Sequence, residues 1–324
     1  MENKYVIGID GGGTKTEGAA VSMSGQVLAI RKGIGINYNN IGMDQARNNL
    51  DQVVSGLVQD CGGDYEALYI GSAALENTAE PEIIQAMAGN KMDPGKMVIE
   101  SDAYMALMGM TIGEPGLIVI CGTGSMVVMD DGTGQQIMGG WGSILNDPGS
   151  GYAVALDGIR ASIKHWEGTG ESTVLGDETL RYFGIQHPRQ LTEKIYTPDC
   201  GVDVIARFSE NVFIAAERGD GVAVQIIQKQ MDEIAKEAAA LLKKAPDVKN
   251  VGLYGGIFQH QRLARTLFSI RMAEKTLDRT INFLTPEYPP ELGAVILYFK
   301  RHNMLTDDVL RQMKESYQKW AIGG

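Results

Sequence analysis

A glycine-rich segment near the start of the chain carries hydroxyl and amine groups that could bind phosphate. Asp10–Thr16 reads Asp-Gly-Gly-Gly-Thr-Lys-Thr and directly follows the apolar run Tyr5–Ile9. Three consecutive glycines let the backbone approach a ligand closely, and Thr14, Lys15 and Thr16 can donate hydrogen bonds to phosphate oxygens. The spacing matches neither a Walker loop nor a dinucleotide-binding fingerprint. We interpret it as a phosphate-binding turn, with a plain hairpin turn as the alternative.

Two more glycine-rich turns follow apolar runs further along the chain. Gly122–Ser125 reads Gly-Thr-Gly-Ser after the run Gly116–Cys121, and Gly255-Gly256 ends the run Val251–Tyr254. Each alone is equally well explained as an ordinary turn. The layout of strand, glycine turn and strand over residues 5–23 recurs around Gly122–Ser125. This repeat favours two similar lobes that each open with such a turn.

Two aspartates could act on a hydroxyl-bearing substrate. Asp102 follows the apolar run Met97–Ile99 and Glu100-Ser101, and a carboxylate at a strand end is well placed to accept the proton of an attacking hydroxyl. It could equally cap a helix over Ala103–Met110. Asp147 can accept charge-assisted hydrogen bonds from two hydroxyls, or it is an ordinary turn aspartate.

The elements that must position these residues alternate along the chain. Short apolar runs predict strands, and the apolar spacing of Asp44–Gln59 and Gln225–Lys243 predicts amphipathic helices. Such alternation indicates an α/β fold, and 324 residues exceed what one hydrophobic core usually holds. We expect lobes over 1–112 and 113–324, with the last helix, about 307–320, a candidate to pack back on the first lobe.

Composition excludes several classes of protein. The formal net charge of −11 disfavours nucleic acid and anionic membranes as partners. The chain has no apolar run long enough to span a membrane, and its start lacks the features of a signal peptide. The three cysteines are scattered, which fits a reducing cytoplasm, and no zinc-ligand spacing occurs. We therefore expect a cytoplasmic protein.

Taken together, the three glycine-rich turns resemble the phosphate-1, phosphate-2 and adenosine motifs of the actin, sugar kinase and Hsp70 ATPase superfamily. Residues 139–151, Gly-Gly-Trp-Gly-Ser-Ile-Leu-Asn-Asp-Pro-Gly-Ser-Gly, resemble the Gly-Gly-Trp-Gly…Asp-x-Gly-Ser segment of N-acetylglucosamine kinases. Those enzymes belong to the BadF/BadG/BcrA/BcrD ATPase family. Four further segments resemble motifs of that family, in order: Gly35–Asn37 with Ile41-Gly42, Ser101–Ala103, Arg218–Asp220 and Pro290–Ala294.

The resemblance implies a fold and a set of site residues. The fold would be α/β, with two ribonuclease-H-like (actin-like ATPase) lobes around a central nucleotide and sugar cleft, and the cofactors would be ATP and Mg²⁺. Asp102 would be the catalytic base, and Asp10 would hold Mg²⁺, through water. The nucleotide would contact Gly12, Gly13, Thr14, Lys15, Gly122, Thr123, Gly124, Gly219, Gly255 and Gly256. The sugar would contact Asn37, Asp102, Gly140, Trp141, Gly142 and Asp147.

The resemblance further implies an amino-sugar kinase that phosphorylates the 6-hydroxyl of N-acetylglucosamine. N-acetylmuramic acid and glucosamine are alternative substrates, and cell-wall recycling would suit the former. Asn146, Pro148 and Gly151 stand where N-acetylglucosamine kinases usually show Gly, Glu and Ala, which leaves the sugar preference open. A homodimer is usual in such kinases.

Two other functions remain as alternatives. An ATPase activator of a 2-hydroxyacyl-CoA dehydratase would need cysteines for a shared iron–sulfur cluster, and none follows the second glycine-rich turn closely. A non-enzymatic sugar sensor would be expected to carry an added DNA-binding module, whereas this acidic chain opens with an apolar run at residue 5. The kinase is the favoured interpretation.

Overall fold

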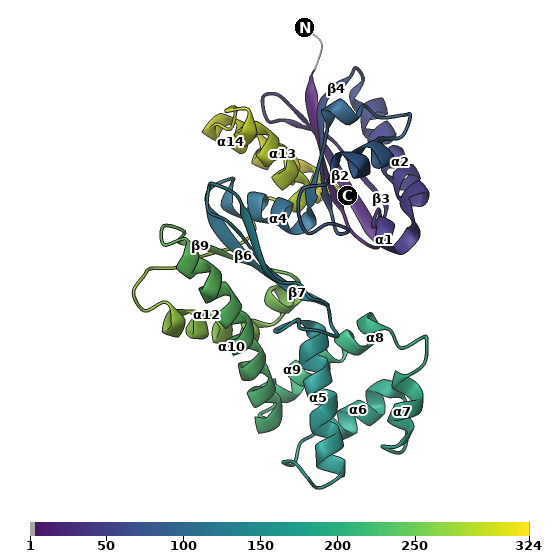
Figure 1. Ribbon diagram of the computed structural model, residues 1–324, viewed down its shortest axis with the longest axis vertical. Helices are drawn as coiled ribbons and strands as arrows, with labels where there is room; N and C mark the ends of the chain where they lie inside the picture. The colour runs from purple at the N-terminus through teal and green to yellow at the C-terminus, as the bar shows by residue number, and fades with distance from the viewer. Residues whose placement is uncertain (1–3, 324) are drawn as a thin grey trace. The chain divides into compact units, whose positions relative to one another are not determined.

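The computed structural model describes residues 4–323, with side chains over 4–320. It divides into two compact units (Figure 1). The first unit comprises the chain up to Gly116, Gly132–Gln135 and the chain from Leu284 onward. The second unit comprises Leu117–Asp131 and Gln136–Phe283. Each unit has its own sheet and its own hydrophobic core.

The first unit is built on a five-stranded sheet in the order β3-β2-β1-β4-β5. Its strands are β1 Tyr5–Gly11, β2 Lys15–Ser22, β3 Val27–Ile34, β4 Tyr65–Ser72 and β5 Met97–Ser101. β1, β2 and β3 pair antiparallel, whereas β4 pairs parallel with both β1 and β5. β1 is central and its apolar run is fully buried, so the polar residue at its end, Asp10, is held in the middle of the sheet.

Helices cover both faces of this sheet. They are α1 Tyr38–Ile41, α2 Met43–Cys61, α3 Pro81–Ala88, α4 Asp102–Thr111, α13 Pro290–Arg301 and α14 Asp307–Gly323, with a short 3₁₀ turn at Pro94–Lys96. The apolar face of α2 packs on β2 and β3. α13 packs on β1, β4 and α4 so closely that a Cβ atom on Gly8 or Gly293 would overlap backbone atoms of Glu291 or Met105.

The placement of the C-terminal segment differs from the expected lobe of residues 113–324. The structure puts the chain from Leu284 onward, including α13, in the first unit. Pro290–Phe299 of α13 are all buried, but a continuous apolar run does not say which sheet it packs against, so the assignment could not follow from local pattern. The last helix, α14, also belongs to the first unit, where the Ser316 hydroxyl accepts a hydrogen bond from the Val27 backbone N–H at 2.9 Å.

The second unit repeats the strand layout of the first. Its sheet has the order β10-β9-β6-β7-β8, which read from β8 matches the first sheet read from β3. The strands are β6 Gly116–Cys121, β7 Ser125–Asp130, β8 Gln135–Gly139, β9 Asn250–Tyr254 and β10 Asn282–Leu284. The recurrence seen in the sequence is therefore a repeat of topology, and the expected α/β class is confirmed.

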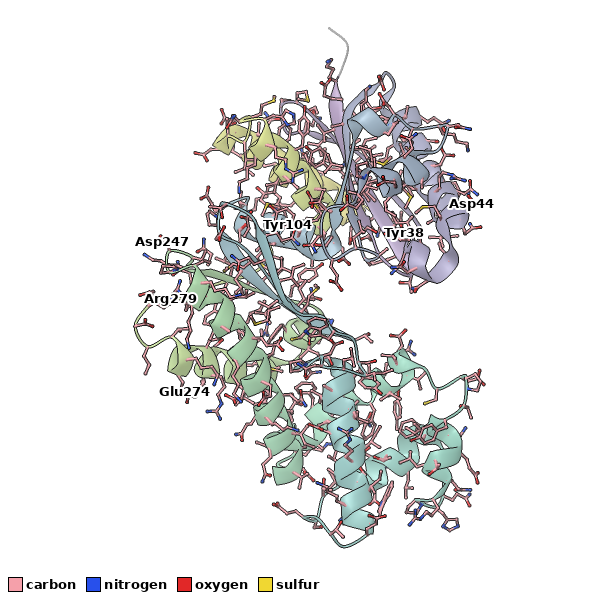
Figure 2. All side chains as sticks on the ribbon, in the orientation of Figure 1. Tyr38, Asp44, Tyr104, Asp247, Glu274 and Arg279 are labelled. Carbon is pink, nitrogen blue, oxygen red and sulfur yellow. The ribbon has the colours of Figure 1, made fainter. Side chains whose placement is uncertain are left out.

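Eight helices surround the second sheet within the described residues. They are α5 Gly151–Trp166, α6 Leu175–Phe183, α7 Gln190–Ile195, α8 Val202–Arg207, α9 Ser209–Glu217, α10 Gly221–Lys244, α11 Gly256–His260 and α12 Arg262–Lys275. The long helix α10 packs against α12, α9 and α5. Arg279, labelled beside the end of α10 in Figure 2, donates a hydrogen bond to the Leu242 carbonyl in the last turn of that helix, where carbonyl oxygens lack partners within the helix.

No helix between residues 4 and 323 is both long and apolar enough to cross a lipid bilayer.

Candidate functional site

The first glycine-rich segment forms the tight turn between β1 and β2. The backbone N–H of Gly12 donates to the Lys15 carbonyl at 3.0 Å, and Gly35 donates to the Thr14 carbonyl at 3.2 Å. These bonds turn the loop's carbonyls toward the protein, while Gly13, Thr14 and Lys15 are exposed. Among the described residues, the Thr14 hydroxyl has no hydrogen-bond partner. The turn therefore presents a free donor, as a phosphate-binding role requires.

Asp10 lies beneath this turn in a strongly acidic environment. Burial raises its pKa to about 7, helped by the negative charges of Glu291, Asp102 and Glu17 and opposed by Lys15. One carboxylate oxygen from each of Asp10, Glu17 and Glu291 lies within 4.8 Å of the other two. Clustered carboxylate oxygens are the donors that Mg²⁺ and similar hard cations prefer, so the residues present fit a bound divalent cation.

Asp102 occupies the first position of α4, directly after β5. The preceding residue, Ser101, is the N-cap of α4, because its hydroxyl accepts the Tyr104 backbone N–H at 3.2 Å. The alternative that Asp102 itself caps the helix is therefore wrong. The Asp102 carboxylate accepts the Ala103 backbone N–H at 2.7 Å, and burial raises its pKa. A largely buried carboxylate that the helix does not need as a cap is free for chemistry.

Asn37 lies at the start of α1 in the same unit. Its side-chain oxygen caps the helix by accepting the Asn39 backbone N–H at 3.0 Å, and its amide nitrogen donates to the Ala73 carbonyl at 3.1 Å. The side chain is thus held in one orientation by two elements. It remains half-buried, which leaves it accessible to a ligand.

The second glycine-rich turn joins β6 to β7 in the second unit. Gly122 donates to the Gly124 carbonyl at 2.9 Å and closes the turn. The first two backbone N–H groups of α5, from Gly151 and Tyr152, donate to the carbonyls of Gly122 and Thr123 at 2.7 and 3.2 Å. The turn's carbonyls therefore point to the helix, and the Thr123 side chain is left exposed.

A cavity of about 450 Å³ lies beside this turn, a size in the usual range for small-molecule sites. Three predicted nucleotide residues line it: Gly122, Thr123 and Gly256. Sequence reasoning did not assign Arg207, Ser209, His260 or Gln261 to a nucleotide site, and all four line the cavity. They come from α8, α9 and α11 with the turn after it, and no motif at those positions could have identified them.

Gly124, Gly219 and Gly255, which were also predicted to contact nucleotide, are not among the residues lining that cavity. Gly255 has φ +92°, and any side chain there would overlap the backbone of Cys121, so it allows β9 to end close to β6. Gly219 has φ +90° and lies in the turn before α10, which Asp220 caps through the Ala223 N–H at 2.9 Å. Their contacts with adenosine stay a prediction.

The predicted sugar loop connects β8 to α5. Gly139, Gly140 and Gly142 all have φ between 72° and 85°, a region that favours glycine. Trp141 is 68% exposed, so it does not anchor the core. Ile144 and Leu145 of the same loop are also largely exposed. The loop therefore presents an apolar surface.

Asp147 holds this loop through a hydrogen bond to its backbone. It is buried, and its carboxylate accepts the Gly142 backbone N–H at 3.0 Å. Burial raises its pKa, although hydrogen bonds from the backbone of Gly142 and Ser125 oppose the rise. It thus connects the sugar loop to the second glycine-rich turn. Its contact with sugar hydroxyls stays a prediction.

The chain is similar to known proteins over most of its length. The profile of the BadF/BadG/BcrA/BcrD ATPase family matches residues 7–297. An N-acetylmuramic acid/N-acetylglucosamine kinase of Clostridium acetobutylicum is 31% identical over 245 residues, covering 74% of this chain and 80% of the relative. An N-acetyl-D-glucosamine kinase of Dictyostelium discoideum is 26% identical over 326 residues, covering 92% and 98%.

A solved structure matches the whole arrangement of elements. A candidate N-acetylglucosamine kinase from Chromobacterium violaceum aligns with a TM-score of 0.72 at 22% identity, covering 90% of this chain and 98% of that chain. Together with the two matching sheets, this likeness establishes the two-lobed actin-like fold of sugar kinases. The predicted fold class is confirmed.

Proposed function

Because the chain belongs to the BadF/BadG/BcrA/BcrD ATPase family, we propose that the protein is an ATP-dependent kinase of amino sugars. The acceptor is the 6-hydroxyl of N-acetylglucosamine or of a close relative. The observation that carries this proposal is the placement of Asp102, a largely buried carboxylate at a strand end whose neighbour Ser101 caps the helix in its stead. The names of the two relatives, both amino-sugar kinases, support it.

The reaction needs a base, in-line placement and charge neutralisation. In our proposal the sugar oxygen attacks the γ-phosphorus of ATP, the bond from that phosphorus to the bridging oxygen breaks, and ADP leaves. Asp102 accepts the hydroxyl proton as the new bond forms. Its raised pKa, caused by burial, makes the carboxylate a stronger base than an exposed aspartate would be.

The remaining site residues bind and orient the two substrates. The free Thr14 hydroxyl and Lys15 donate to phosphate oxygens, and the Thr123 hydroxyl is assigned the same role. The cavity beside Gly122 and Gly256 takes the nucleoside. Asn37, Asp147 and the loop Gly140–Gly142 bind the sugar, and Trp141 forms an apolar wall.

A divalent cation, Mg²⁺, belongs to the same proposal, with Asp10 as its protein contact. When bound it neutralises phosphate charge during transfer. The chain's formal net charge of −11 gives ATP little cationic surface, so the cation's contribution is correspondingly large. Localisation in the cytoplasm, assembly as a homodimer and a role in cell-wall recycling are the finer parts of the proposal.

An assay of ADP release tests the proposal directly. Glucose, glucosamine, N-acetylglucosamine and N-acetylmuramic acid are each added with MgATP, and ADP is measured by a coupled reaction. We expect release to depend on an amino sugar, with N-acetylglucosamine among the best. Release that no sugar stimulates would contradict the proposal.

A further inference from the structure

Three carboxylates converge at the end of the central strand of the first unit. In the antiparallel pairing of β1 with β2, Asp10 lies directly opposite Glu17. Gly8 and Asp10 share a face of β1 because side chains alternate along a strand. α13 packs against that face at Gly8, and this brings Glu291 of its first turn to the pair. The three carboxylate oxygens lie within 4.8 Å of one another.

While all three carboxylates are ionised this arrangement is unfavourable, and a bound cation would relieve it. Like charges directly opposite on neighbouring strands destabilise a sheet. The cations nearest to the cluster are Lys15 and Lys32, which pair with Glu17 at 3.2 and 3.5 Å and have largely exposed side chains. Within the described part of the chain, neither Asp10 nor Glu291 forms an ion pair.

Glu291 gives the second and independent indication of a ligand. It is only 2% exposed. One oxygen, Oε1, accepts the Tyr317 hydroxyl at 3.0 Å, whereas Oε2 is buried with no hydrogen-bond partner among the described residues. Leaving a buried acceptor unsatisfied typically costs about 1–3 kcal/mol, so this oxygen is expected to serve a ligand that the protein chain does not itself supply.

We propose that Asp10, Glu17 and Glu291 form a site that holds a hard divalent cation, of the Mg²⁺ and Mn²⁺ class, without nucleotide. This deepens the proposed function, which assigns the cation only to Asp10 and to ATP. Two oxygens on one ion can be no further apart than twice the metal–oxygen distance, about 4.2 Å for Mg²⁺ and about 4.8 Å for Ca²⁺. The observed upper limit of 4.8 Å is close to the span that a single ion can bridge.

The proposal gives Glu291 a role beyond the one its position suggests. An acidic residue in the first turn of a helix is favourable by itself, because it faces the positive end of the helix dipole. That role alone would not require Glu17 and would not respond to metal. Glu291→Gln keeps the size and the acceptor for Tyr317 and removes the charge, so it separates the two roles.

Titration of the nucleotide-free full chain with Mn²⁺, followed by the loss of the free-ion EPR signal, tests the site. We expect one Mn²⁺ per chain, displaced by excess Mg²⁺. Glu291→Gln and Glu17→Gln should each weaken Mn²⁺ binding at least tenfold. Glu287→Gln is the matched control, because Glu287 pairs with Lys314 on the surface and should bind Mn²⁺ as the wild type does.

Two results would overturn the proposal: no Mn²⁺ bound at millimolar concentration without nucleotide, or wild-type affinity in Glu291→Gln. If Glu291→Gln is unfolded at the assay temperature, Glu17→Gln decides by the same criterion. Sugar-dependent ADP release is measured separately at saturating MgATP. Its absence in a protein that still binds Mn²⁺ through Glu17 and Glu291 would refute the kinase proposal and leave the cation site standing.

Discussion

The hydroxyl of Ser101 accepts the backbone N–H of Tyr104 at 3.2 Å (Figure 2 labels Tyr104 on α4), and this bond caps α4. The neighbouring Asp102 is therefore not the N-cap of α4, although its position in the sequence suggests that role. The helix cap and the proposed catalytic base are thus two adjacent side chains, which can be changed separately.

Asp102→Asn should lower turnover by about 10²–10⁴-fold, since loss of a general base typically has this effect. The melting temperature should hardly change, because Ser101 still caps α4. Ser101→Ala is the matched control, and it should cost about 1 kcal/mol of stability with turnover within a few fold of wild type. Steady-state kinetics and thermal melts of both variants decide the matter, and an Asp102→Asn enzyme within threefold of wild type would remove Asp102 from the mechanism.

Thr123→Val should raise the KM for ATP about tenfold, because it removes a hydrogen bond to a charged phosphate oxygen. The KM for sugar should be unchanged. Thr123 lines the second-unit cavity, and valine keeps its shape. Thr266→Val is a suitable control, because Thr266 lies on the exposed face of α12 and bonds only to the Arg262 carbonyl. Equal KM values for ATP in wild type and Thr123→Val would argue against nucleotide in this cavity.

Gly8→Ala should destabilise the protein by about 3 kcal/mol, at the upper end of overpacking costs. The added methyl would overlap the backbone oxygen of Glu291, and backbone cannot move aside as a flexible side chain can. Gly221→Ala, where nothing lies within 4 Å of the new atom, should leave the melting temperature unchanged or raise it slightly. Urea unfolding of the two variants measures the difference.

Arg301→Ala should cost about 3–5 kcal/mol, the usual effect of leaving a buried charge unpaired. Glu100 is 1% exposed and accepts Arg301 at 2.7 Å and the Thr78 hydroxyl at 2.6 Å. The double variant with Glu100→Gln should recover part of that loss, because the uncompensated charge is gone. Chemical denaturation of the single and double variants tests this, and purely additive losses would show that the pair is not coupled.

Acid should destabilise the second unit partly through Asp220. Burial opposes ionisation of this residue, but hydrogen bonds from Ala223, Val174 and Thr173 outweigh it and lower its pKa. A lowered pKa in the folded state means that the contribution to stability is present above the unfolded value near 3.8 and is lost as the pH falls below it. Asp220→Asn should therefore unfold with a shallower pH dependence below pH 4, as monitored by circular dichroism.

Local pattern predicted most of the elements that position the site. The helices expected over Asp44–Gln59 and Gln225–Lys243 correspond to α2, Met43–Cys61, and α10, Gly221–Lys244. The strand expected over Val251–Tyr254 corresponds to β9, Asn250–Tyr254. The two helices are apolar along one face at the helical period, β9 is a short apolar run, and burial of these apolar residues favours each element. Asp102 at a strand end followed from the same reasoning.

Features that depend on tertiary contact could not be predicted in this way. β8 has only half-buried residues, so its apolar pattern is weak. Glu291 lies far along the chain from Asp10, and only the packing of α13 against Gly8 brings the two together. Arg207 and Gln261 reach their cavity from separate helices and turns. The local sequence around these residues does not indicate such long-range contacts.

The return of the C-terminal helices to the first unit bears on the order in which the protein can fold during synthesis. The chain passes between the units after Gly116, Asp131, Gln135 and Phe283. All of the second unit has therefore been synthesised before α13 is made. Until then the face of β1 at Gly8 is uncovered, and Glu100 lacks its partner Arg301. The part of the chain synthesised first is the part that must wait longest to be completed.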